Sequence, residues 1–146
     1  MKGFTFIEII LVVAIMLTIS IMTPTFYSRF LLQNSVANTT DQLAGSMRKA
    51  QFQSMMGKNA DSWSVNYSAN TITLYKGNNF GVRDPSFDEK FTVNPNISVS
   101  GFTDLNFAKV SGLPSPGPFP LNVSISSSSG NNSDVVTVNS QGVVSR

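Results

Sequence analysis

A continuous apolar stretch near the N-terminus is the strongest constraint on how this chain can fold. From Phe4 to Met22 only four of 19 residues are polar, namely Thr5, Glu8, Thr18 and Ser20. As a helix this stretch is about 28 Å long, which matches a hydrocarbon core of roughly 30 Å. We therefore expect a transmembrane helical segment over residues 4–24, with Lys2 as the cation that keeps its start cytoplasmic.

A second helical segment follows Pro24. Proline lacks an amide proton and crowds the preceding turn, so we expect a kink or a local opening there. Helical spacing then resumes as far as Met56, and Gly57 supplies a stop. The segment 25–57 is therefore predicted to be amphipathic, with an apolar face made of Val36, Leu43, Met47, Ala50 and Ser54 beside Phe30 and Ala37.

The rest of the chain, 58–146, changes from helical spacing to the alternating pattern of strands. Strands are expected at 63–67, 71–75, 90–93, 97–100, 105–110, 121–126, 135–139 and 143–145. The stretch 112–120 is too rich in proline and glycine for a regular element. The predicted fold class is α+β, with one long N-terminal helix, transmembrane and then amphipathic, packed on a C-terminal antiparallel β-sheet head.

Composition excludes most catalytic and metal chemistry. The chain has no histidine and no cysteine, which removes Ser-His-Asp and Cys-His catalysis, thiol chemistry, disulfides and the common transition-metal ligands. The acidic group Asp84, Asp88 and Glu89 lacks the spacing of an EF-hand calcium loop and is interpreted as a solvated loop. We expect a protein that is not an enzyme and that carries no cofactor and no metal.

Basic residues offer one alternative function, which is DNA binding. Ten basic and eight acidic residues give a net charge of only +2. The candidate phosphate contacts are Arg48, Lys49, Lys58 and Arg146. The competing interpretation is a set of ordinary surface charges, because the nine basic and seven acidic residues beyond Glu8 are dispersed along the chain.

Glu8 is the one charge inside the apolar stretch. A secretory signal peptide has a charge-free apolar core followed by a small-residue cleavage site, and neither feature is present. An acid in a membrane segment costs on the order of 2–3 kcal/mol and calls for a cationic partner. The competing interpretation is that Glu8 only caps its own helix near the membrane surface.

The N-terminal sequence Lys2-Gly3-Phe4-Thr5-Phe6-Ile7-Glu8 and the apolar residues after it resemble the class III signal of type IV prepilins and pseudopilins. The resemblance implies a leader of residues 1–3, cleavage after Gly3 by a prepilin peptidase, and methylation of the new amine of Phe4. It also implies that Glu8 pairs with the N-terminal amine of a neighbouring subunit during filament assembly. On this view Glu8 sets the stagger between neighbouring helices.

Less specific apolar patterns in the rest of the chain resemble the minor pilins and pseudopilins of GspH/FimT type, in which an all-β head follows the helix. The expected function is that of a minor pilin of a type IV pilus or pilus-like filament. A type II secretion pseudopilin and a DNA-binding competence pilin remain as alternatives. The implied partners are other pilin subunits, the prepilin peptidase, and the cytoplasmic (inner) membrane with its assembly platform. The implied location is that membrane with the head outside the cytoplasm, and then a cell-surface or periplasmic filament.

Overall fold

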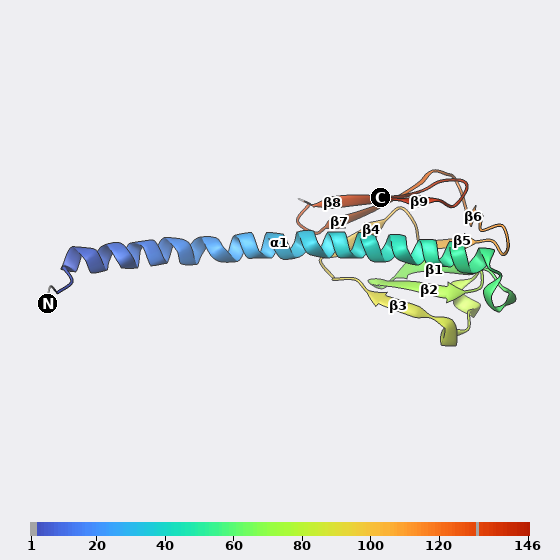
Figure 1. Ribbon diagram of the computed structural model, residues 1–146, viewed down its shortest axis with the longest axis horizontal. Helices are drawn as coiled ribbons and strands as arrows, with labels where there is room; N and C mark the ends of the chain where they lie inside the picture. The colour runs from blue at the N-terminus through green and yellow to red at the C-terminus, as the bar shows by residue number, and fades with distance from the viewer. Residues whose placement is uncertain (1–2, 131) are drawn as a thin grey trace.

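The computed structural model describes residues 3–130 and 132–146, except for the side chains of residues 22–26. One helix of 50 residues, α1 (Phe6–Met55), crosses the head and then projects far beyond it, as Figure 1 shows. The C-terminus lies on the head, whereas the N-terminus lies at the free end of the projecting helix (Figure 1). The chain is therefore α+β, as expected from the change of pattern at residue 58.

The head consists of two antiparallel sheets, where the sequence had predicted one. The strands are β1 (Trp63–Ser68), β2 (Thr71–Lys76), β3 (Glu89–Thr92), β4 (Ile97–Ser100), β5 (Asp104–Phe107), β6 (Pro114–Ser115), β7 (Leu121–Ser127), β8 (Ser133–Val138) and β9 (Val144–Ser145). One sheet has the order β3-β2-β1-β5-β6 and the other the order β4-β7-β8-β9. Three short 3-10 helices, Lys58–Ala60, Phe80–Val82 and Pro85–Phe87, lie in the connections.

Most of the predicted strands are confirmed to within one or two residues, with two exceptions. The strand expected at 105–110 ends at Phe107. The stretch 112–120 was wrongly predicted to contain no regular element, because Pro114 pairs with Phe107 and Ser115 with Asn106. Proline is tolerated there because β6 is an edge strand, on which a missing amide breaks no ladder.

The predicted end of α1 is confirmed. Gly57 directly follows the C-cap residue Met56 and has a φ of 60°, the left-handed conformation that glycine adopts without steric cost. The helix end is joined to the first strand, since the Ser54 hydroxyl accepts a hydrogen bond from the Trp63 amide at 2.8 Å. The backbone remains helical through Pro24, but the side chain of Pro24 lies outside the described residues, so the kink remains a prediction.

The prediction that the first half of the helix is transmembrane is wrong. Among the residues that the structure describes, none of the helices combines the length and the apolarity needed to cross a bilayer. α1 runs from Phe6 to Met55 without a break, so the apolar residues form only the first part of one longer helix, and this part also carries Glu8, Thr18 and Ser20.

The second half of α1 packs where the two sheets meet. It contacts β1, β2 and β5 of one sheet and β4, β7, β8 and β9 of the other. The predicted helix face is confirmed from Val36 onward, since Leu43, Met47 and Ala50 are completely buried. Phe30 was wrongly included in that face: it is 59% exposed because it precedes the point where α1 meets the head.

The opposite face of the five-stranded sheet is polar. Ser64 on β1 and Asn106 on β5 are register partners, and the Asn106 side-chain amide donates to the Ser64 hydroxyl at 2.7 Å. The Tyr75 hydroxyl reaches across from β2 and donates to both carboxylate oxygens of Asp104 at 2.8 Å. Asn66 is also buried on this face, and its Oδ1 has no hydrogen-bond partner. Alternation along the strands thus separates an apolar face under α1 from a polar outer face.

Two methionines, Met47 in α1 and Met56 at its C-cap, test how much of the stability comes from this packing. We expect Met47→Ala to lower the free energy of unfolding by about 2–5 kcal/mol, because Met47 is completely buried and the change leaves a cavity. Met56→Ala is the matched control and should change stability by less than about 0.5 kcal/mol, because Met56 is exposed. Denaturant titration followed by circular dichroism measures both. Equal losses would contradict the packing described here.

Candidate functional site

The projecting part of α1 presents apolar side chains on all of its sides. The large hydrophobic residues from Phe4 to Ile21 are between 45% and 82% exposed. A helix that is apolar all round is normally buried, and an exposed apolar surface of this extent marks a site of interaction. The segment therefore needs a covering that a single copy of the chain does not provide.

The start of this helix is fixed by a capping box. The Glu8 amide donates a hydrogen bond to the Thr5 hydroxyl at 3.4 Å. In return, the Thr5 amide donates to the Glu8 carboxylate, also at 3.4 Å. These two bonds satisfy donors that the first helical turn leaves without intrahelical partners. In the single chain, the Glu8 carboxylate therefore caps its own helix, which was the competing interpretation of this residue.

Capping leaves the Glu8 carboxylate able to accept further hydrogen bonds. A carboxylate has about four acceptor sites, and the structure describes one bond to it, from Thr5. The carboxylate lies at the N-terminal end of the helix dipole, and Phe4 is the residue immediately before Thr5. An ammonium group created on Phe4 would therefore arise beside an exposed carboxylate that can still accept bonds.

Gly3 and Phe4 lie in exposed backbone before the helix begins. Gly3 is not part of a regular element, and a Cβ added to it would meet no atom within 4 Å. Phe4 is 82% exposed. The predicted cleavage position therefore lies in exposed chain outside any regular element, which is where proteolytic cleavage concentrates.

The four candidate DNA contacts do not form one basic surface. Lys49 pairs with Glu89 of β3 at 2.6 Å, on the side of the five-stranded sheet. Arg48 donates to the Val144 carbonyl of β9, on the side of the other sheet. Lys58 lies over the Trp63 ring at 5.6 Å beyond the end of the helix.

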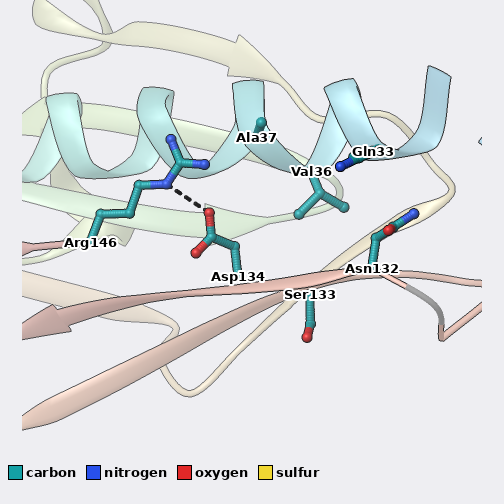
Figure 2. Close-up of a pocket in the computed structure, with 7 residues that line it drawn as sticks. All are labelled: Gln33, Val36, Ala37, Asn132, Ser133, Asp134 and Arg146. Carbon is teal, nitrogen blue, oxygen red and sulfur yellow. Dashed lines mark hydrogen bonds and ion pairs between the residues drawn. The ribbon is translucent and has the colours of Figure 1, made fainter. Parts of the chain in front are cut away.

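Arg146, the fourth of these residues, links α1 to β8. Its guanidinium pairs with Asp41 of α1 at 2.6 Å and with Asp134 of β8 at 2.7 Å. Figure 2 shows Arg146 and Asp134 at one side of a cleft of about 380 Å³ between α1 and β8. The charge of Arg146 is thus largely compensated, which leaves little of it for a nucleic-acid phosphate.

The acidic residues near Pro85 have separate protein partners. Asp88 pairs with Arg83 at 3.0 Å and with Lys90 at 3.4 Å, while Glu89 pairs with Lys49. The Ser86 amide and hydroxyl donate to Asp84, and these hydrogen bonds lower the pKa of its carboxyl group. Over residues 3–130 and 132–146, the acidic side chains form no group that could hold a metal ion.

Two features of these sites were missed in the sequence. Thr5 is part of the capping box, and its local signal was available because a threonine three residues before a glutamate is the sequence signature of this cap. No local pattern in the sequence predicted the second feature, the ion pairs of Arg146. Asp41 is 105 residues away from Arg146, and only the fold brings the two together.

Comparison of the chain with protein-family models, with curated proteins and with solved structures finds no match.

The projecting segment should be energetically independent of the head. We expect the double substitution Ile10→Ser and Ile15→Ser to leave the unfolding temperature of the head unchanged within about 1 °C, because these residues are exposed and precede the head. Leu43→Ser on the same helix should lower that temperature by several degrees. Thermal unfolding followed through the near-ultraviolet signal of Trp63 measures both, and a large effect of the first pair would show that the segment packs on the head.

Proposed function

We propose that this protein is a structural subunit of a filament, a minor pilin of a type IV pilus or a pilus-like fibre. The observation that supports this proposal is an apolar helix that projects without any covering and carries a single acid in its first turn. The residues around Gly3 that resemble a prepilin signal give the same assignment. The chain acts by assembling, and it catalyses no reaction.

Other subunits are the covering that best fits this helix. The head occupies one end of α1 and leaves the other end bare, so a copy that covers the bare end presents a bare end of its own (Figure 1). Such head-to-tail contacts generate helical fibres when the rotation from one copy to the next does not close into a ring. Packing the apolar segments side by side removes them from water, at roughly 25 cal/mol per Å² of buried apolar surface.

Glu8 would set the register of this packing. Once apolar helices surround it, an unpaired carboxylate is strongly unfavourable, and removal of one partner of a buried ion pair typically costs about 3–5 kcal/mol. The amine of Phe4 on a neighbouring, processed subunit is the cation within reach. The stagger that pairs the two groups is then favoured over all others, while the Thr5 cap can persist.

A structural role is favoured over DNA capture. Lys49 and Arg146 are neutralised by acidic partners, and Arg48 and Lys49 point to different sheets. The proposed partners are therefore other pilin subunits, the prepilin peptidase and the assembly platform of the cytoplasmic membrane. The head would lie outside the cytoplasm, on a cell-surface or periplasmic filament.

Processing can be tested by the intact mass of the protein purified from filaments. We expect the chain to lack residues 1–3 and to carry one methyl group on the amine of Phe4. N-terminal sequencing of the same sample identifies the first residue. A chain in mature fibres that retains Met1, Lys2 and Gly3 would contradict the proposal, because no amine would then be available on Phe4.

Two substitutions separate the pairing of Glu8 from its capping. Glu8→Gln keeps a side chain that can cap the helix but removes the charge, and we expect incorporation into filaments to fall about tenfold or more. Thr5→Ala removes the cap, costs about 0.5–2 kcal/mol of helix stability and keeps the charge, so incorporation should persist. Quantitative immunoblotting of sheared filaments against total cell protein measures both. The reverse pattern would show that Glu8 is only a cap.

A further inference from the structure

Two cavities lie beside Asn78, in the loop that follows β2, and the first of them opens on the polar outer face of the five-stranded sheet. One, of about 260 Å³, is lined by Asn78, Asp104, Asn106, Ser115 and Pro116. The other, of about 270 Å³, is lined by Asp61, Lys76, Gly77, Asn78, Asn79, Val82, Arg83 and Asp84. Asn78 lines both, so we refer to the pair as the Asn78 groove. Each cavity is slightly smaller than the ligand pockets of proteins, about 300–1,000 Å³, and is of a size to hold one small ring.

The first cavity contains polar atoms that the protein holds in place without using them fully. Tyr75 orients the carboxylate of Asp104, each of whose oxygens can accept a further bond. Ser64 and the Gly77 carbonyl accept from the amide nitrogen of Asn106, and its Oδ1 has no partner among the described residues. Burial raises the pKa of Asp104, against the opposing hydrogen bond from Tyr75. These groups are preorganised, which reduces the entropy cost of binding.

Two exposed residues, Asn78 and Ser115, are the remaining polar residues that line the first cavity. The side chains of Asn78 and Ser115 make no hydrogen bond to any other described residue. Asn78 comes from the loop that follows β2, whereas Ser115 comes from the edge strand β6. An amide, a second amide oxygen, a carboxylate and a hydroxyl thus converge on one small cavity from separate elements. The Pro116 ring adds an apolar wall.

The charges of the groove narrow the class of ligand. The two cavities are lined by three acids, Asp61, Asp84 and Asp104, and by two cations, Lys76 and Arg83, of which Arg83 is already paired with Asp88. A phosphate or another anion is disfavoured, because no excess of positive charge is present to hold it. A neutral ligand whose groups both donate and accept hydrogen bonds matches the lining.

We propose that the Asn78 groove binds a neutral oligosaccharide, with one sugar ring in each cavity and Asn78 contacting both. Every sugar hydroxyl is both a donor and an acceptor, so neighbouring hydroxyls can donate to Asp104 and to Asn106 Oδ1 while accepting from Asn78 and Ser115. The CH face of a ring packs on Pro116. The head would then carry a glycan-binding function that does not depend on how the helix assembles.

Nuclear magnetic resonance titration of the isotope-labelled full chain tests this proposal. The protein is held in a zwitterionic detergent, which has no sugar headgroup to compete for the groove. The probes are maltotriose, cellotriose and chitotriose, their monosaccharides, and the peptide trialanine. We expect at least one trisaccharide to bind saturably, to shift the amide signals of Asn78 and Asn106, and to bind about tenfold more tightly than its monosaccharide.

Variants locate the site. Asn78→Ala and Ser115→Ala should each weaken binding by about fivefold to tenfold without unfolding the head, because both side chains are exposed and unbonded. Asn38→Ala, at an exposed position of α1, is the matched control and should bind as the unaltered chain does. The proposal is overturned if none of the trisaccharides binds saturably, if only trialanine binds, if the monosaccharide binds as tightly as the trisaccharide, or if Asn78→Ala binds normally.

Discussion

The packing of the second half of α1 against both sheets is the interaction on which the rest of the structure depends. Leu43, Met47 and Ala50 are completely buried where the two sheets meet, and no disulfide is available to hold the head together. Two small sheets, each with one apolar face, need a common element to bury those faces. The helix is that element, and it therefore fixes the geometry of the head.

The same arrangement explains why the first half of α1 is bare. Both sheets pack their apolar faces on the helix from Val36 onward, and the first half of α1 lies beyond the head (Figure 1). A rigid helix cannot fold back, and its backbone remains helical through Pro24. The apolar segment is consequently displayed at a fixed direction from the head, which suits assembly with further copies in a repeating arrangement.

The five-stranded sheet has one apolar face and one polar face. The apolar face of the five-stranded sheet lies under α1, whereas its polar outer face carries Asp104 and Asn106. Strand alternation places the two sets on opposite sides of the same strands. A filament built through the helix would leave the outer face of each head in contact with solvent, and the cavity of the Asn78 groove beside Asp104 and Asn106 lies on that face.

Local patterns in the sequence determined much of this protein. Most of the strands, the helix end at Gly57 and the buried helix face from Val36 to Ser54 follow from periodicity and turn chemistry, which act between near neighbours. The site around Glu8 was equally local, because its cap involves only Thr5. The tertiary structure alone decided where α1 meets the head and how the strands divide into two sheets. It also decided which charges are paired, since these outcomes depend on contacts between residues far apart in the chain. The apolar stretch shows the difference between the two kinds of information. Its apolar composition can be read from the sequence, but only the tertiary structure shows that the head leaves it exposed.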